Sequence, residues 1–216
     1  MLGGADTERL VLYNTHNAAK TDIPGVDMDD LIARHKARYH LVAFFCRPGM
    51  RVLDFPCGTG YGSEILTQQG VRYEGRDNDT KTIDYGETQY GHRCAKFRHG
   101  NLKHPAKPRD VEAFDIIACI EGIEHIQMAN QEDMVCGFHA MLKPGGKLII
   151  SSPINPTGIS GPSAHNPHHL GELTYTDFLD LLAHHFDCLE TQTLTTTETL
   201  STGEKSGCVF AICQKD

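Results

Sequence analysis

The sequence has no excess of basic residues. It carries 20 Lys and Arg against 28 Asp and Glu, which gives a formal net charge of −8. Proteins that hold nucleic acid backbones need clustered positive charge. The basic residues between Arg34 and Arg47 are more typical of one solvated helix face. Nucleic acid is therefore an unfavoured partner.

The sequence also has no paired cysteine motif and no long hydrophobic run. Its eight cysteines form no C-x-x-C pair, and several lie in apolar segments such as IIACI and CVFAIC, where cysteine acts as a small buried hydrophobe. No apolar run approaches the ~18 residues of a membrane helix, and no signal-peptide pattern opens the chain. We expect a cytoplasmic protein with reduced cysteines and no membrane partner.

From Pro48 onward, short β-like segments alternate with helical ones. Strands are predicted at MRVLDF, VRYEGR, AKFRH, FDIIACI and KLIISSP, and helices at GYGSEILTQQ, TKTIDYGETQY and QEDMVCGFHAML. The segment KPGG is expected to end the last helix. Such alternation predicts an α/β fold with a parallel sheet and right-handed crossovers.

The two ends of the chain differ from this pattern. Residues 1–47 are predicted to be helical and additional to the sheet, most strongly over MDDLIARHKARYHLVAFF. Near the other end LTYTDFLDLLAHHF is predicted to form a helix, with Thr174 and Asp177 at capping-box spacing. LETQTLTTTETL and GCVFAICQ are predicted to form a hairpin. No repeat or linker interrupts the 216 residues, so a single domain is expected.

The segment RVLDFPCGTGYG contains three glycines after a predicted strand. Glycine allows a tight turn and a close approach of the backbone to a ligand. The spacing is G-x-G-x-G with Asp54 ahead of it, whereas the dinucleotide fingerprint is G-x-G-x-x-G. A carboxylate here repels a diphosphate and attracts an ammonium group. The loop therefore favours S-adenosylmethionine over a nicotinamide cofactor.

VLDFPCGTGYG resembles motif I of the class I S-adenosylmethionine-dependent methyltransferases, and YEGRDND, FRHGNL, FDIIACIEGIEHI and LKPGGKLIISSP follow in that family's order. The resemblance extends from about Met28 to Gln214. It implies a Rossmann-like, seven-stranded, mostly parallel sheet with helices on both faces and an antiparallel C-terminal hairpin. The helical residues 1–47 are expected to add an N-terminal lid.

The resemblance also assigns cofactor contacts. Asp77 corresponds to the acid that takes both ribose hydroxyls, and Asn101 stands where an Asp more often contacts the adenine amine. Arg38, in a segment that resembles an H-x-x-R-Y motif, is expected to pair with the methionine carboxylate; the alternative is an ordinary surface helix there. The expected cofactor-binding residues are Arg38, Asp54, Gly58, Gly60, Tyr61, Asp77, Asn78, Asn101, Leu102 and Ile120.

Three polar residues, Glu121, Glu124 and His125, follow the predicted strand FDIIACI. If a helical turn begins near Glu121, then Glu121 and His125 share one face. His125 could act as general base. The residues could instead bind a divalent metal with a distant histidine, or the acids could complement a helix dipole.

The pattern E-x-x-E-H resembles two metal-using branches, the ubiquinone-biosynthesis O-methyltransferases and the small-RNA terminal 2′-O-methyltransferases. In the latter, a further His lies before a helix, as His168 and His169 do here. The pattern N-P-x-H-x-x-E, from Asn166 to Glu172, also resembles bacterial methyltransferases of sugars and secondary metabolites in which no metal is generally assigned. The catalytic candidates are Glu121, His125 and His169, and the candidate metal ligands are Glu121, Glu124, His125 and His169.

The sequence therefore predicts methyl transfer from S-adenosylmethionine to a small-molecule or sugar acceptor, most readily at oxygen. The first alternative is a metal-assisted RNA 2′-O-methyltransferase. The second is a non-catalytic partner subunit that binds S-adenosylmethionine. Acceptor identity and oligomeric state have no signal in the sequence, because acceptor contacts come from variable loops.

Overall fold

The structure is a computed structural model that describes residues 28–92, 94–164, 166–199 and 205–216. Its seven strands form one sheet in the order β3-β2-β1-β4-β5-β7-β6. The chain divides into two compact units, one up to Gly100 and one from Asn101. The expected α/β class with a parallel core and antiparallel C-terminal strands is confirmed.

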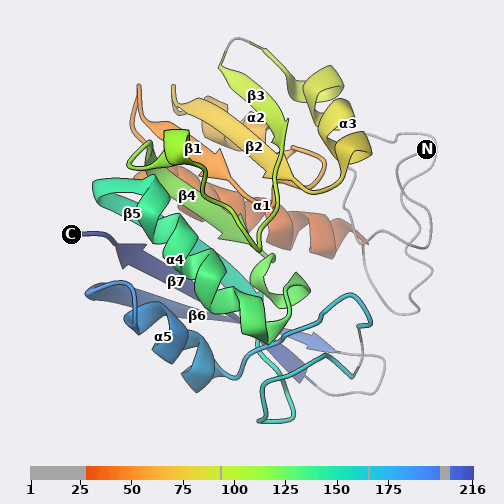
Figure 1. Cartoon of the computed structure of the whole chain (residues 1–216). Coiled ribbons are helices and arrows are strands. Elements are labelled where there is room, and N and C mark those ends of the chain that lie inside the picture. Colours follow the sequence, from red (N-terminus) through yellow and green to blue (C-terminus); the bar gives the residue numbers. More distant parts are fainter. Residues whose placement is uncertain (1–27, 93, 165, 200–204) are drawn as a thin grey trace. The chain divides into compact units, whose positions relative to one another are not determined.

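The first unit alternates helices and parallel strands. Its strands β1 and β2 are parallel, as are β2 and β3. Helix α1 packs against α2, and α3 lies along β2 and β3 (Figure 1). The side chain of Asp79 caps α3 by accepting hydrogen bonds from the N–H groups of Lys81 and Thr82. The elements are α1 (Met28–Phe45), β1 (Arg51–Asp54), α2 (Gly62–Thr67), β2 (Arg72–Asp77), α3 (Thr80–Tyr90) and β3 (Ala95–His99).

The second unit contains the antiparallel end of the sheet. β4 and β5 are parallel, whereas β7 runs antiparallel to both β5 and β6. Its elements are η1 (Pro108–Asp110), β4 (Phe114–Ile120), η2 (Ile123–His125), η3 (Met128–Asn130), α4 (Gln131–Met141), β5 (Leu142–Pro153), α5 (Tyr175–Ala183), β6 (Cys188–Thr199) and β7 (Lys205–Gln214).

Strand β4 is the most apolar strand of the second unit. Six of its seven residues are buried, and such a continuous run is typical of a parallel strand that is covered on both faces. Helices α4 and α5 lie side by side over one face of this unit's strands (Figure 1). Helix α4 contributes Met134, Phe138 and Met141, each fully buried, to the core beneath it. The strand ends that carry the polar candidates are therefore fixed by packing.

Helix α4 ends at Met141, just before KPGG, as expected. The predicted start of β5 at Lys147 is wrong. The strand begins at Leu142, and its register with β4 shifts between the pair Phe114–Leu142 and the pair Ile116–Lys147. The predicted cap of α5 is confirmed, because the hydroxyl of Thr174 accepts from the N–H of Asp177 at 3.2 Å.

The part of the predicted lid before Met28 lies outside the described residues. In the described segments, no helix is both long and apolar enough to cross a membrane.

Candidate active site

The loop between β1 and α2 depends on its glycines. Gly58 and Gly60 have φ angles of 51° and 88°, in the left-handed region that favours glycine. A Cβ on Gly60 would lie 2.5 Å from the ring of Phe97, and a Cβ on Gly62 would lie 2.2 Å from the ring of Tyr39. A Cβ on Gly58 would meet no atom within 4 Å. The loop is thus packed on one side and has space at Gly58.

Asp54, the last residue of β1, is completely buried. Its carboxylate accepts a hydrogen bond from the hydroxyl of Tyr39 at 3.2 Å and another from the hydroxyl of Tyr73 at 2.7 Å. Burial raises the pKa of Asp54 from 3.8 to about 7, although both tyrosine bonds oppose the rise. Two phenols therefore stabilise the predicted negative charge of Asp54. The fraction of Asp54 that is ionised depends on pH near neutrality.

Asp77 connects the glycine loop to the end of β2. Its Oδ2 accepts a hydrogen bond from the N–H of Gly58 at 3.1 Å, and its Oδ1 accepts one from the N–H of Asp79 at 3.1 Å. The residue is 3% exposed, whereas the following Asn78 is exposed. This carboxylate fixes both the loop and the turn after β2. Its contact with a ribose stays a prediction.

One face of α1 packs on the same loop. The ring Nδ1 of His35 lies 2.8 Å from the hydroxyl of Tyr61, and Tyr39, one helical turn further on, reaches Asp54. Arg38 lies between them in the sequence and is 5% exposed. The predicted shared face of His35, Arg38 and Tyr39 is thus largely covered, which disfavours the alternative of a simple surface helix.

The other expected cofactor residues belong to the second unit. Asn101 is exposed, and its side-chain oxygen accepts from the N–H of Lys103 at 3.0 Å. Leu102 and Ile120 are buried. Their contacts with an adenosine stay predictions.

Glu121 differs from the expectation of a helical turn. It has a φ angle of 51°, which is uncommon for a residue with a side chain. The short helix that follows spans only Ile123–His125, so Glu121 and His125 do not share a helical face. Instead, the Oε1 of Glu121 accepts from the hydroxyl of Ser151 at 2.7 Å and from the thiol of Cys208 at 3.2 Å. The carboxylate of Glu121 is held at the ends of β5 and β7.

Glu124, His125 and His169 come together in the second unit. Each offers one ligand atom, and these atoms lie within 4.8 Å of one another. The Nε2 of His125 is 3.9 Å from the Oε1 of Glu124, and the two imidazole rings meet edge to face with centroids 4.9 Å apart. Glu124 is 1% exposed. Of the four candidate metal ligands, the cluster therefore brings together three and leaves Glu121 outside.

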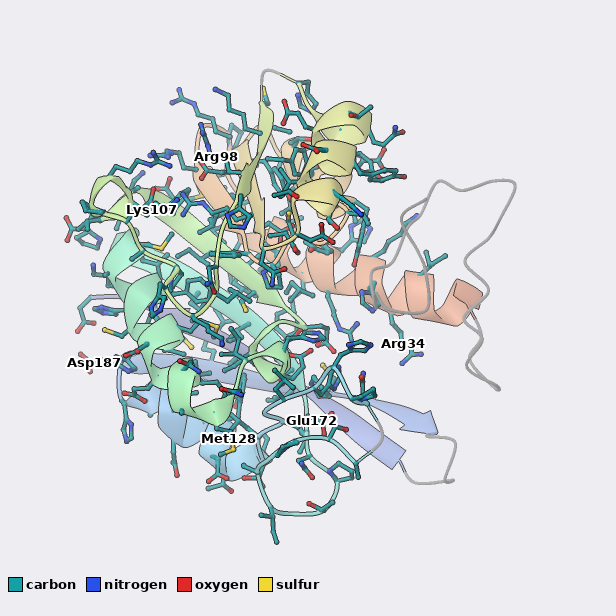
Figure 2. All side chains as sticks on the ribbon, turned by 45° about the vertical axis from the view of Figure 1, so that its right-hand side comes forward. Arg34, Arg98, Lys107, Met128, Glu172 and Asp187 are labelled. Carbon is teal, nitrogen blue, oxygen red and sulfur yellow. The ribbon has the colours of Figure 1, made fainter. Side chains whose placement is uncertain are left out.

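Hydrogen bonds determine the tautomers of both histidines. The Nδ1 of His125 lies 3.1 Å from the carbonyl oxygen of His168, which can only accept, so this nitrogen carries the proton. The Nδ1 of His169 lies 2.6 Å from the Oε1 of Glu172, a buried acid on the loop between β5 and α5 (Figure 2). In each neutral ring, Nε2 then carries the lone pair.

Gln131 joins the two segments that carry this cluster. Its side-chain amide donates to the carbonyl oxygens of Ile123 and Ile126, both at 3.1 Å, and of Gly171 at 2.7 Å. The N–H of Gly171 in turn donates to the carbonyl oxygen of Glu124 at 3.0 Å. The turn of Glu124 and the loop of His169 are therefore fixed to each other by buried bonds.

Comparison with known families decides the class. Residues 27–195 match the family described as a methyltransferase domain. The chain belongs to this family. The match covers most of the chain, and it confirms the resemblance on which the expected cofactor, S-adenosylmethionine, rests.

Relatives agree with this assignment. The chain is 30% identical over 162 residues to a probable S-adenosylmethionine-dependent methyltransferase of Mycolicibacterium smegmatis, covering 74% of this chain and 60% of that protein. It is 32% identical over 104 residues to a ubiquinone biosynthesis O-methyltransferase of Coxiella burnetii, covering 48% and 44%. The chain thus spans about half of the length of these relatives.

Solved structures share the fold. A Haemonchus contortus phosphoethanolamine N-methyltransferase 2 with bound S-adenosylhomocysteine matches with a TM-score of 0.70 and 15% identity, over 85% of this methyltransferase chain and 53% of the other. The [4+2]-cyclase SpnF matches with a TM-score of 0.67 and 14% identity, over 87% and 81%. These similarities concern the fold alone, since the identities are only 15% and 14% and the two proteins are named for different reactions.

Several residues of the site escaped the sequence analysis. Tyr73, Gln131 and Glu172 hold candidate residues in place but were not predicted as site residues. Tyr73 begins YEGRDND and Glu172 ends N-P-x-H-x-x-E, so both lie in segments that carried a resemblance. Gln131 lies in no such segment, and its partners are brought to it by the fold.

Proposed function

We propose that the chain transfers a methyl group from S-adenosylmethionine to an oxygen of a small-molecule or sugar acceptor. The observation that carries the proposal is the pair of histidines, His125 and His169, whose Nδ1 atoms are fixed so that Nε2 carries the lone pair. An imidazole in this state can take a proton from a hydroxyl. The O-methyltransferase name of the Coxiella burnetii relative also supports oxygen as the acceptor atom.

The residues of the first unit suit the cofactor. S-adenosylmethionine supplies an activated methyl group next to a positively charged sulfur. Buried Asp54 provides a negative charge for the ammonium group, and Asp77 is an acceptor for the ribose hydroxyls. The space at Gly58 allows a ligand to approach the backbone of the loop. Arg38 is the proposed partner of the methionine carboxylate, and Asn101 of the adenine amine.

In this proposal, residues of the second unit act on the acceptor. The hydroxyl proton of the acceptor would leave for His125 or for solvent, and the acceptor oxygen would use its electron pair to form the new C–O bond. The methyl–sulfur bond of the cofactor would break in the same step, with its electron pair left on the sulfur. Fixed donors and acceptors that need no rearrangement during reaction contribute much of the rate in enzymes. The acidic total charge supports an uncharged or cationic acceptor over an RNA backbone.

Transfer of a labelled methyl group tests the proposal. The full chain is incubated with labelled S-adenosylmethionine and with a panel of phenols, catechols, sugars and a short RNA duplex, and mass spectrometry locates the methyl group. We expect an O-methylated phenol, catechol or sugar. Transfer to the RNA duplex, or to a nitrogen or carbon, would contradict the proposal. Stabilisation by S-adenosylhomocysteine without any transfer would favour the non-catalytic alternative.

A further inference from the structure

An open cavity lies in the second unit, between the segment that follows β5, the first turn of α5 and Gly207 of β7. Its volume is about 660 Å³, and small-molecule sites typically have volumes of roughly 300–1,000 Å³. We infer that this cavity binds a neutral pyranose ring of the methyl acceptor. The inference rests on the proposed function and narrows its acceptor class to sugars.

Asn155 supplies a fixed hydrogen-bond donor to the cavity. The residue is 5% exposed, and its Oδ1 accepts from the backbone N–H of Thr157 at 3.0 Å and from the hydroxyl of Thr157 at 2.7 Å. Because a backbone N–H can only donate, these bonds determine which side of the amide is oxygen. Within the described part of the chain, no group accepts from Nδ2, and this atom is not enclosed by protein. It is therefore available to a ligand in the cavity that Asn155 lines.

The first turn of α5 adds two further donors. The hydroxyl of Thr174 accepts from the N–H of Asp177 and so caps the helix. The N–H groups of Tyr175 and Thr176 come before this bond and have no acceptor inside the helix. Both residues line the cavity, and Tyr175 is 38% exposed. This wall of the cavity therefore offers N–H groups together with an accessible aromatic ring.

Asp177 places an acceptor beside these donors. Its carboxylate accepts from the hydroxyl of Ser160, which itself accepts from the N–H of Thr174 at 2.8 Å. Hydrogen bonds from Ser160 and Thr174 lower the pKa of Asp177 below its ordinary value of 3.8, so the carboxylate is ionised at neutral pH. The charge repels an anionic ligand, whereas the N–H donors disfavour a cationic one.

A neutral ligand rich in hydroxyl groups matches this arrangement. Each hydroxyl both donates and accepts, so one sugar ring can accept from Asn155 and donate to Asp177. The apolar face of the same ring can pack on Tyr175. A phenol or catechol has only one or two hydroxyls on a flat apolar ring, and would leave most of the polar groups of the cavity unpaired. The cavity therefore favours a pyranose over an aromatic acceptor.

One loop joins the cavity to the histidine of the proposed reaction (Figure 1). The N–H of Asn155 donates to the carbonyl oxygen of Leu173 at 2.9 Å. The residue before Leu173 is Glu172, which accepts from the Nδ1 of His169 at 2.6 Å. Hydrogen bonds therefore fix the cavity wall and the imidazole on the same loop, so a sugar bound in the cavity lies on the loop that carries a proposed base.

Saturation-transfer NMR of the full chain tests the site. Protein saturated with S-adenosylhomocysteine is mixed separately with glucose, galactose, rhamnose and catechol. We expect saturation of the ring protons of at least one of the three pyranoses, and weaker binding of catechol. Asn155→Asp keeps an acceptor for Thr157 but has no N–H to donate, so it should lower the affinity for that pyranose at least about tenfold. Asp177→Asn removes the charged acceptor and should lower it similarly.

Two matched variants are the controls. Asn130→Asp makes the same amide-to-acid change at the N-cap of α4, and Asp180→Asn makes the same acid-to-amide change on the exposed side of α5. Neither residue lines the cavity, so both variants should bind the pyranose as the wild type does. Equal losses in the cavity variants and the controls would overturn the inference.

The outcomes separate the inference from the proposed function. Binding of no pyranose, tighter binding of catechol, or unchanged affinity in Asn155→Asp would overturn the sugar site, while methyl transfer to a phenol or catechol would leave the proposed function standing. Pyranose binding that depends on Asn155, without transfer to any acceptor, would support the site and overturn the proposed reaction. If Asn155→Asp fails to fold, Gly207→Leu decides, because a Cβ there meets only Ile154 at 3.6 Å. Its side chain is added at the cavity wall, and unchanged pyranose affinity would overturn the site.

Discussion

The hydroxyl of Tyr73 donates a 2.7 Å hydrogen bond to the carboxylate of Asp54, and both groups are buried. This bond favours the ionised form of the acid and so lowers its pKa, while burial raises the pKa to about 7. The ionisation of Asp54, which is proposed to bind the cofactor ammonium group, therefore depends on pH and on these hydrogen bonds. A loss of either tyrosine bond shifts the balance toward the neutral acid.

Tyr73→Phe should weaken cofactor binding most near neutral pH. Without the phenol, the pKa of Asp54 rises further, so a smaller fraction of the acid is ionised at a given pH. A hydrogen bond to a charged group contributes about 1.5–3 kcal/mol, which corresponds to roughly a tenfold or greater loss of affinity. Titration with S-adenosylhomocysteine between pH 6 and pH 9 measures this loss of affinity. Tyr85→Phe is the control, because Tyr85 is a half-buried tyrosine of α3. Equal affinities for Tyr73→Phe and the wild type across this range would contradict the prediction.

The raised pKa of Asp54 also predicts how stability depends on pH. The folded chain holds this proton up to about pH 7, whereas the unfolded chain releases it near 3.8. Between these values the folded state binds more protons, so the contribution of Asp54 to the free energy of unfolding falls as pH rises through this window and stays low above it. Asp54→Asn removes that contribution.

Thermal melting of Asp54→Asn and the wild type, from pH 4 to pH 8, tests this dependence. The difference in melting temperature should shift in favour of Asp54→Asn as pH rises, and should level off above about 7. A constant difference across the series would show that the acid is ionised throughout.

Local patterns predicted the elements well. The bounds of α1, α3, β3 and β4 agree with the predicted segments, because apolar spacing and caps are features of contiguous residues. The start of β5 was predicted at Lys147 but lies at Leu142, because Leu142 pairs with Phe114 of β4 ahead of a register shift that spans KPGG. This long-range pairing has no signal in the local sequence.

The candidate residues were predictable, but their partners were not. Motif spacing identified Asp54, Asp77 and the E-x-x-E-H pattern. The bond of Glu121 to Cys208 joins residues 87 positions apart, and no local pattern encodes it. The left-handed φ angle of Glu121, 51°, was likewise not predicted. The sequence pattern therefore predicted Glu121 as a metal ligand beside Glu124 and His125, whereas its carboxylate bonds to Ser151 and Cys208.

Gly62→Ala should disrupt the packing of α1. The added Cβ would lie 2.2 Å from the ring of Tyr39, which is 2% exposed and has little room to move. Overpacking of this kind typically costs about 1–3 kcal/mol. Denaturant unfolding should show the loss, and hydrogen exchange should be faster in α1. Gly161→Ala, where a Cβ meets no atom within 4 Å, is the control; similar losses in both variants would contradict the prediction.

Gln131→Leu should separate the Glu124 turn from the His169 loop. It removes one donor group that serves three buried carbonyl oxygens, and an unsatisfied buried acceptor costs about 1–3 kcal/mol. We expect lower stability to denaturant and slower methyl transfer, since the turn of His125 and the loop of His169 are no longer held together. Gln127→Leu, at an exposed position, should change neither. Unaltered stability in Gln131→Leu would contradict the prediction.

Glu172 gives a selective test of histidine orientation, because it contacts His169 and is not itself a proposed base. Its Oε1 accepts from the Nδ1 of His169 at 2.6 Å, so Glu172→Ala frees the ring to rotate and to change tautomer. A positioned base typically contributes about 10²–10⁴-fold to a rate, so we expect methyl transfer by Glu172→Ala to be at least about tenfold slower. Glu172→Gln keeps an acceptor oxygen and should retain most of the rate, and Glu132→Ala, from the His185 pair at 2.7 Å, should retain all of it. Rates of methyl transfer that ranked Glu172→Gln no better than Glu172→Ala would assign the residue a purely structural role.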